Sequence, residues 1–348
     1  MQIIINAGGT GTRLWPYSTG KVPKQFVPLI DDTNFLRKTY DRIVSDNSQN
    51  NVWVNTNEKF ESLVKNSLPN NFLKSNILTE PEKRDNFAAI VAHAAVVAYH
   101  TTDTEPLIFV HADHLIQQKD WQKFCKSLRS SAKSLINQDF EIITAGVRPK
   151  SANTQLGYIE IRVEDITKCF ESAVTIKQFK EKPDQFTANK FLKAGNFLWN
   201  LGYFSFTYDT LIKNISRYTP EILDVIKEIR KTGVITQDLY KELPKTTFDY
   251  AIAEKSESLG VIGIDIDWED IGNWQIAAKY LPEIKDNKNL IQIEGQNNKV
   301  KSPDKERKVA FVGVSDLILV ESEEGLLVVN PEYSAEVKKV AKYFESLS

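Results

Sequence analysis

Short apolar runs alternate with longer stretches of helical periodicity through the first two-thirds of the chain. Buried parallel strands read as continuous apolar runs, and the helices between them show a period near 3.6, so this alternation predicts βαβ units. The expected strands are 2–6, 51–56, 106–110, 141–147, 157–163, 173–179, 203–207 and 260–266. The expected helices are 35–44, 58–67, 85–100 and 121–136. The predicted fold class is α/β, with a doubly wound, mixed but mostly parallel sheet.

The character of the sequence changes after residue 282. Residues 285–308 are polar and rich in Lys and Asn, and the alternating charges of KSPDKERK predict an exposed loop. Short strands are then expected at 309–312, 316–321 and 325–329. A closing helix from about residue 331 carries an apolar stripe, formed by Val337, Val340, Ala341, Phe344 and Leu347. We therefore expect one large α/β domain at 1–283 and a small β-rich tail with a closing helix at 284–348.

Composition narrows the function classes. At roughly 150 residues per domain, 348 residues favour about two domains. The chain has 44 Lys and Arg against 46 Asp and Glu, which lacks the basic excess of proteins that bind nucleic acid through its backbone. Cys125 and Cys169 form no CxxC motif, which argues against a disulfide framework or structural zinc. With neither a signal peptide nor an apolar span in the sequence, we expect a cytoplasmic protein without nucleic-acid or membrane partners.

The most informative segment is residues 7–26, AGGTGTRLWPYSTGKVPKQF, directly after the first expected strand. Glycines let the backbone approach a ligand closely, and ligands bind at the carboxyl ends of parallel strands. A dinucleotide fingerprint is excluded because Leu14 occupies the third glycine position, and the lysine of a Walker A loop is missing. The loop instead offers N–H donors with two cations, Arg13 and Lys24, which suits a phosphate chain.

This segment resembles the signature of sugar-1-phosphate nucleotidyltransferases, and WPYS and PKQF are typical of members that act on mannose 1-phosphate with GTP. Further segments resemble family motifs in order: TEPEKRDNFAAI (79–90), FVHADH (109–114), LGYIE (156–160), FKEKPD (179–184), NFLWNLGYFSF (196–206), FDYAIAEKS (248–256) and DWEDIGNW (267–274). The resemblance covers most of the chain. It implies a Rossmann-like nucleotidyltransferase fold, a short tail of left-handed β-helix type, and no appended isomerase domain.

The resemblance also implies a reaction. GMP passes from GTP to α-D-mannose 1-phosphate, giving GDP-mannose and pyrophosphate by in-line attack of the sugar phosphate on the α-phosphorus. Such chemistry needs positioning and charge neutralisation rather than a side-chain nucleophile. Two alternatives stay open: a nucleotidyltransferase for another sugar 1-phosphate, such as a heptose or glucose, and a non-catalytic paralogue that binds nucleotide-sugar and regulates a partner. The tail implies a homodimer.

Two carboxylates are candidates for a Mg²⁺ site. Asp113 comes within three residues of the strand at 106–110, and Asp270 follows the strand at 260–266 at a similar offset. Magnesium prefers one or two carboxylates together with phosphates and water, and the resemblance implies that these two are its ligands. A turn or helix-cap role remains the alternative for Asp113. His111 and His114 lack a nearby third soft ligand, so zinc is not expected.

The resemblance assigns the remaining site residues. The catalytic set is Arg13, Lys24, Asp113 and Asp270. The nucleotide-binding set is Ala7, Gly8, Gly9, Gly11, Thr12, Arg13, Lys24, Glu80, Pro81, Arg84, Asn86 and Asp113. The sugar-phosphate set is Gly157, Tyr158, Glu181, Lys182 and Asn200, with Glu181 for vicinal hydroxyls and Lys182 for the phosphate. Guanine is inferred from PKQF, because RDNFAA (84–89) lacks the usual Ser/Thr and Pro. For the EKP turn (181–183) and the helical segment DYAIAEKS (249–256), an ordinary solvent-exposed surface without a binding role remains the alternative.

Overall fold

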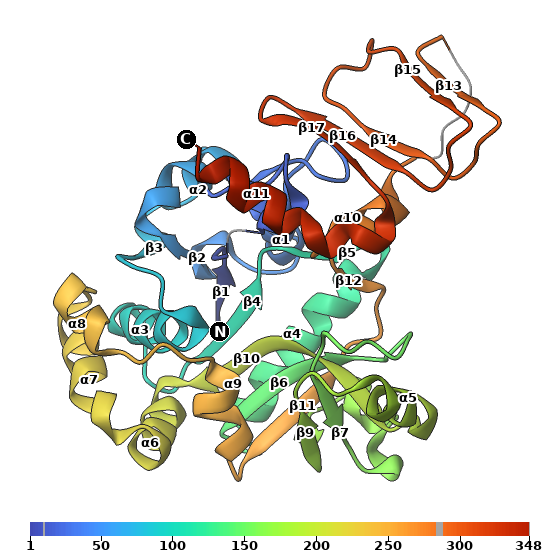
Figure 1. The fold of residues 1–348 in the computed structure, drawn as a ribbon. Coiled ribbons are helices and arrows are strands. Elements are labelled where there is room, and N and C mark those ends of the chain that lie inside the picture. Colours follow the sequence, from blue (N-terminus) through green and yellow to red (C-terminus); the bar gives the residue numbers. More distant parts are fainter. Residues whose placement is uncertain (10, 283–287, 348) are drawn as a thin grey trace.

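The computed structural model describes residues 1–9, 11–282 and 288–347, so the expected domain boundary at 283/284 lies outside the described residues (Figure 1). The central sheet has the strand order β3-β2-β1-β4-β10-β6-β11-β8. These strands are β1 (Gln2–Asn6), β2 (Val52–Asn57), β3 (Ile77–Glu80), β4 (Pro106–His111), β6 (Ile142–Val147), β8 (Val174–Thr175), β10 (Phe197–Thr207) and β11 (Leu259–Gly263). β10 is antiparallel to both β4 and β6, so β1, β2, β3, β4, β6 and β11 share one direction. The mixed, mostly parallel sheet is confirmed.

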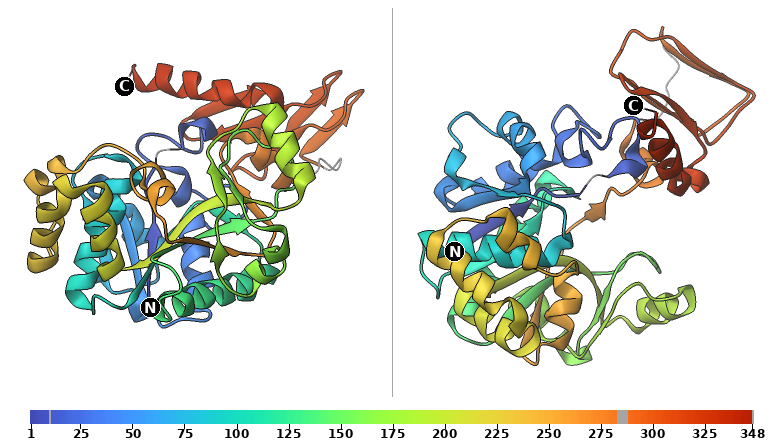
Figure 2. Two further views of the ribbon diagram at one scale, coloured as in Figure 1. Left: turned by 90° about the horizontal axis from the view of Figure 1, so that it is seen from below. Right: turned by 60° about the vertical axis from the view of Figure 1, so that its left-hand side comes forward.

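Helices cover both faces of this sheet (Figures 1 and 2). In β1, Ile3 and Ile5 belong to one buried cluster and Ile4 to the other, because successive side chains of a strand point to opposite faces. The first cluster includes residues of α1 (Phe35–Val44), α2 (Glu61–Ser67) and α4 (Trp121–Ile136). The second includes residues of α3 (Asp85–His100), α6 (Tyr208–Tyr218), α7 (Leu223–Thr232) and α9 (Phe248–Ala251). The fold is doubly wound, as expected.

The four expected helices are present, but several other elements differ from the expectation. The strand expected at 173–179 is split into β8 and β9 (Gln178–Lys180), and the one at 157–163 is shortened to β7 (Tyr158–Glu160). β7 and β9 pair with each other, and β7 also pairs with β10. Helices absent from the expectation are α5 (Gln185–Ala194), α6, α7 and α8 (Gln237–Glu242). Buried apolar positions on α6 and α7 pack on the sheet and α3.

The tail corrects one expectation. Residues 285–308 were expected as a loop, yet they contain β13 (Leu290–Ile293) and β14 (Lys299–Lys301). The other tail elements are β15 (Val309–Val312), β16 (Ile318–Ser322), β17 (Gly325–Val329) and α11 (Val337–Glu345). β13 pairs in parallel with β15, and β14 with β16, each joining residues nineteen positions apart as in one rung of a β-helix. Residues 303–308 are exposed, as expected for most of KSPDKERK.

A third buried cluster joins the tail to the rest of the molecule. It combines Leu14 and Trp15 of the glycine-rich segment with Trp274 of α10 (Trp274–Ala277). Its tail members are Ile318, Val320, Leu327, Val329, Val337 and Ala341. The tail therefore shares a hydrophobic core with the segment that the sequence singled out. Among the residues that the structure describes, no helix combines the length and apolar character needed to cross a membrane.

Candidate active site

The glycine-rich segment leaves the carboxyl end of β1 and is held from inside by Gln25. The Gln25 side-chain amide donates hydrogen bonds to the carbonyl oxygens of Ala7 at 2.8 Å, Gly8 at 3.1 Å and Gly9 at 3.3 Å. These bonds fix the backbone path that the sequence predicts for phosphate binding. The sequence prediction missed Gln25, although the residue lies within the PKQF motif that identified the loop.

Gly11 lets the segment pass close to Lys24. Its φ of +61° lies in the left-handed region, and a Cβ at this position would lie 2.9 Å from the Lys24 Cβ. Any other residue would therefore combine backbone strain with a collision against the stem of Lys24.

Lys24 joins the two predicted metal carboxylates. Its Nζ lies 3.0 Å from Asp113 Oδ2 and 2.9 Å from Asp270 Oδ1, and it also donates to the Ile271 carbonyl at 3.3 Å. We call Lys24, Asp113 and Asp270 the charge cluster. Three of the four predicted catalytic side chains thus meet; the fourth, Arg13, is exposed and has no ion pair within the described part of the chain.

A small strand pair brings the two carboxylates together. β12 (Trp268–Asp270) runs antiparallel to β5 (His114–Ile116), and Asp270 lies opposite His114. β11 itself is separated from β4 by β10 and β6 in the central sheet. The end of β11 alone could not bring Asp270 next to Asp113, so the offset argument from sequence does not explain the position that the β5–β12 pair gives to Asp270.

Opposite charges dominate the electrostatics of the charge cluster. Burial disfavours the charged form of Lys24, but Asp113 and Asp270 outweigh this effect and raise the pKa of Lys24. Burial likewise opposes ionisation of Asp113, yet the ammonium group of Lys24 holds the pKa of Asp113 well below its usual range. The pKa of Asp270 is lowered in the same way. All three groups are therefore charged at neutral pH.

Two histidines and a tyrosine form a neutral wall beside the charge cluster. Tyr203 Oη lies 2.7 Å from His114 Nδ1, and the His114 ring packs edge-on against Trp268 at 4.9 Å between centroids. Burial lowers the pKa of His114 to about 3, so its imidazole is uncharged at neutral pH. The wall adds shape and hydrogen-bonding capacity without adding charge.

A hollow of about 170 Å³ opens next to the charge cluster. Asp270, His111 and His114 contribute to its lining, and so do the predicted sugar-binding residues Gly157, Glu181 and Asn200. The structure therefore brings one predicted metal ligand and three of the five predicted sugar-binding residues to one hollow, although these four residues come from four separate motifs. Asn86 is the predicted nucleotide-binding residue that also lines this hollow.

Asn200 is tied into a chain of hydrogen bonds that ends at Asp249. Asn200 Oδ1 accepts from Thr144 Oγ1 at 2.9 Å and from the Gly202 N–H at 3.1 Å, while its Nδ2 donates to Asp249 Oδ1 at 3.0 Å. Burial, reinforced by the charge of Glu181, raises the pKa of Asp249 to about 6. Asp249 lines the hollow and was missing from the predicted set; the signal for it was the DYAIAEKS motif.

The EKP turn lies at the edge of the hollow. Lys182 Nζ and Glu181 Oε1 are 2.7 Å apart, and both side chains are exposed. A Cβ on Gly157 would lie 2.5 Å from Glu181 Oε2, so the glycine is needed for Glu181 to lie where it does. Tyr158 is buried instead, with its ring on Phe191 and its hydroxyl 3.4 Å from the Ser151 carbonyl.

The segment after β3 makes contacts mainly with the α8 side. The Glu80 carboxylate accepts a hydrogen bond from the Tyr240 hydroxyl, and Arg84 pairs with Glu82 and donates to the Leu243 carbonyl at 2.6 Å. Asn86 Oδ1 accepts from the Phe248 N–H at 2.8 Å. Glu80 and Arg84 are thus engaged with protein groups, and their nucleotide roles stay predictions, as do those of Pro81 and Thr12.

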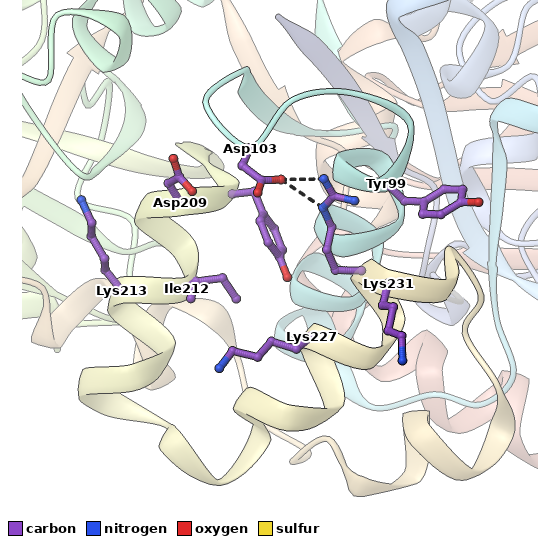
Figure 3. Close-up of a pocket in the computed structure, with 9 residues that line it drawn as sticks. Tyr99, Asp103, Asp209, Ile212, Lys213, Lys227 and Lys231 are labelled. Atoms are coloured by element: carbon purple, nitrogen blue, oxygen red, sulfur yellow. Dashed lines mark hydrogen bonds and ion pairs between the residues drawn. The ribbon is translucent and has the colours of Figure 1, made fainter.

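A wider hollow of about 740 Å³ lies between α3, α6 and α7 (Figure 3). Arg230 and Asp103, which form an ion pair at 2.8 Å, belong to its lining, and so do Lys213, Lys227 and Lys231. No predicted site residue and no member of the charge cluster lines it. Predicted site residues therefore line the smaller hollow and not this wider one.

The donor set of the charge cluster fits magnesium bound together with a substrate. Across residues 1–9, 11–282 and 288–347, no group of three or more His, Cys, Asp or Glu side chains could hold a metal ion by itself. Mg²⁺ commonly takes only one or two carboxylates and completes its shell with phosphates and water. Asp113 and Asp270 satisfy that requirement.

Comparison with known proteins decides the family. A family model described as nucleotidyl transferase matches residues 2–286. The chain belongs to the nucleotidyl transferase family. A second model, described as a MannoseP isomerase/GMP-like beta-helix domain, matches residues 288–343 of this nucleotidyltransferase.

Individual relatives extend over the whole chain. Mannose-1-phosphate guanylyltransferases of Escherichia coli and Klebsiella pneumoniae are 31% and 30% identical, covering 98% of this chain and 73% of each relative. Among solved structures, a Thermus thermophilus protein named mannose-1-phosphate geranyltransferase matches with a TM-score of 0.84 and 24% identity, covering 99% of both chains. That match supports the fold, with the tail included.

Proposed function

We propose that this nucleotidyltransferase transfers GMP from GTP to α-D-mannose 1-phosphate, giving GDP-mannose and pyrophosphate. One observation carries the proposal: Lys24 bridges Asp113 and Asp270 at the border of a hollow that also contains Glu181, Asn200 and Asp249. This arrangement suits a triphosphate on one side and a hydroxyl-rich sugar on the other. The names of the relatives supply the base and the sugar.

In the proposed mechanism a sugar phosphate oxygen attacks the α-phosphorus in line. The attacking oxygen is already ionised, so no general base is needed, and the neutral His111 and His114 fit that requirement. The barrier comes largely from bringing two anions together. Lys24, Arg13 and the loop N–H groups are placed to neutralise this charge, which is the largest catalytic contribution available to such a site.

Asp113 and Asp270 would hold a Mg²⁺ ion together with phosphate oxygens. The ion, when bound, supplies further neutralisation of the triphosphate charge. The role of the protein is then to keep both carboxylates ionised and correctly placed, which the contacts with Lys24 and the β5–β12 pair support.

On the sugar side, Glu181 and Asp249 offer carboxylate oxygens to vicinal hydroxyls. Asn200 holds Asp249 in place, so its main effect on the sugar passes through that carboxylate. Lys182 is exposed at the rim and reaches the sugar phosphate in this proposal.

The deciding experiment measures pyrophosphate release for four nucleoside triphosphates against mannose, glucose and heptose 1-phosphates. We expect turnover with GTP and mannose 1-phosphate to exceed every other pair. Preference for another sugar would move the enzyme to a different sugar 1-phosphate, and no turnover in any pair would support a binding paralogue. The Asp113→Ala variant, with its fold checked by circular dichroism, should lose metal-dependent turnover.

We further propose that residues 1–283 and 284–348 form two domains and that the enzyme is a cytoplasmic homodimer. The free, buried Cys125 and Cys169 fit a reducing compartment. The tail strands expose apolar side chains, among them Ile291, Ile293, Val312, Leu326 and Val328. An exposed apolar surface of this kind is typical of a subunit contact.

A further inference from the structure

The last helix, α11, lies along the outer side of the glycine-rich segment (Figures 1 and 2). The Phe344 ring stacks on Trp15, with ring centroids 5.2 Å apart and an angle of 18° between the planes. The next residue, Glu345, accepts a hydrogen bond through Oε1 from the Gly20 N–H at 3.0 Å. Helix and segment are therefore joined by a stacked aromatic pair and a charge-assisted hydrogen bond.

The tail strands touch the same stretch. Ser322 Oγ donates to the Pro16 carbonyl at 2.9 Å, and the Lys301 ammonium lies 5.4 Å from the centre of the Tyr17 ring. Gly325 lies so close to Trp15 that a Cβ there would be 3.0 Å from the indole ring. Residues 15–17 are thus each contacted by the tail.

The inner side of the segment leads straight to the charge cluster. Trp274 Nε1 donates to the Trp15 carbonyl at 2.8 Å, and Trp274 follows Asp270 by four residues. Arg13 and Lys24 flank the stretch 15–20 that the tail holds. The tail is therefore in contact with the backbone that positions both cations and, through Trp274, with the backbone that carries Asp270.

We propose that Phe344 and Glu345 are positioning residues for the nucleotide site. By holding residues 15–20 from outside, α11 keeps Arg13 and Lys24 in the arrangement that a triphosphate meets. Ordering a flexible loop costs conformational entropy, so a loop ordered in advance binds its ligand more tightly. The identity of the ligand rests on the proposed function, whereas the dependence of loop order on the tail does not.

Three variants test the proposal in the full-length enzyme. Phe344→Ala/Glu345→Ala removes the stacking and the hydrogen bond, and Phe344→Tyr/Glu345→Gln keeps a ring and an amide oxygen in the same places. Leu347→Ala is the matched control, because this apolar residue lies in the turn directly after α11 and is 68% exposed. If the double Ala variant does not fold, Phe344→Ala alone replaces it.

Two readouts separate positioning from general destabilisation. Amide hydrogen exchange of residues 11–22 should accelerate about tenfold in the Ala variant, and the Kd for GTP should rise about five- to tenfold, in line with the loss of an aromatic pair and a charge-assisted bond. The KM for mannose 1-phosphate should stay unchanged, because Glu181, Asn200 and Asp249, which line the sugar side of the hollow, lie outside the segment 15–20 that the tail contacts. Leu347→Ala should match the wild type, and the conservative variant should lose less than the Ala variant, because it keeps a ring and an acceptor oxygen but not the charge.

Unchanged exchange in the Ala variant overturns the proposal, and so does an equal loss of affinity for both substrates. Failure of the wild type to bind GTP would refute the proposed function instead. In that case the exchange measurement still decides whether the tail orders the loop.

Discussion

At the scale of single residues, Lys24 controls the charge balance of the site. It pairs with two carboxylates that would otherwise repel each other, and it belongs to the segment that we propose binds the triphosphate. The glycines and the PKQF string in the sequence predicted a site role for this residue. Its bridging role could not be predicted, because it depends on β12 folding back onto β5.

Lys24→Met should lower kcat/KM by about 10²–10³-fold, which corresponds to the loss of one preorganised charge contact worth about 3–4 kcal/mol. The measurement is pyrophosphate release at saturating Mg²⁺. Lys21→Met is the control, because Lys21 lies in the same segment but is exposed. Activity within a factor of three of the wild type in Lys24→Met would contradict the role of Lys24.

The raised pKa of Asp249 predicts that the free energy of unfolding depends on pH. This pKa is raised from 3.8 to about 6, so the folded state binds the proton more tightly than the unfolded state. The stability that Asp249 contributes is full below pH 4 and is lost as the pH rises through 6. Asp249→Asn keeps an oxygen for Asn200 and does not titrate. Its unfolding free energy relative to the wild type should therefore increase between pH 4 and 8, by up to about 3 kcal/mol at 1.36 kcal/mol per pH unit.

Urea unfolding at several pH values measures this difference. Glu181 and Glu254 are the nearby acids that raise the pKa of Asp249. Glu254→Gln serves as the comparison, and we expect a smaller pH-dependent change from it because Glu254 is less buried. A difference between Asp249→Asn and the wild type that stays constant with pH would show that Asp249 titrates normally.

At the scale of elements, the strands and helices of the first βαβ units followed from apolar patterning alone. β1, β4, α1, α3 and α4 match their expected ranges closely because each is buried on a regular face. Patterning failed for β13 and β14, whose side chains are at most half-buried and therefore show no continuous apolar run. It also gave no sign of β12, a three-residue strand whose partner determines its conformation.

Gly157, directly before β7, lies close to Glu181, directly after β9, and this contact predicts how a substitution at Gly157 changes sugar binding. In Gly157→Ala the new Cβ overlaps Glu181 Oε2, so the carboxylate must shift from its present position at the hollow. The KM for mannose 1-phosphate should rise about tenfold, as expected when a charged hydrogen-bond partner of the sugar is lost. The Kd for GTP should not change, and paired steady-state and binding assays separate the two effects.

Gly313→Ala is the matched control for Gly157→Ala. Gly313 has a φ of +64° with open space around it, so the substitution strains the backbone far from the hollow. An unchanged KM for mannose 1-phosphate in Gly157→Ala would show that Glu181 does not contact the sugar.

At the scale of the whole molecule, the tail offers two surfaces with different roles. Its inner residues belong to the core that contains Leu14, Trp15 and Trp274. Its outer residues on β17, Leu326 and Val328, are 58% and 54% exposed. We expect the first surface to order the active site and the second to contact another copy of the chain.

Leu326→Glu/Val328→Glu should convert a homodimer into a monomer. Charges at the centre of an apolar interface lose their hydration on association, which opposes dimerisation strongly. Light scattering should give a mass near twice 39.6 kDa for the wild type and near 39.6 kDa for the variant. Ile136→Glu, at an apolar position that is 65% exposed at the end of α4, should leave the mass unchanged. A wild type that stays monomeric at every concentration would refute the dimer.

The hydrogen bond from Gly20 to Glu345 joins residues 325 positions apart. During translation the glycine-rich segment leaves the ribosome well before α11, because it lies far upstream in the chain. At about 5–20 residues per second, the delay between them is on the order of tens of seconds. Throughout that interval the glycine-rich segment lacks its outer support, so under the proposal above a nascent chain should reach its full nucleotide affinity only after α11 has been made.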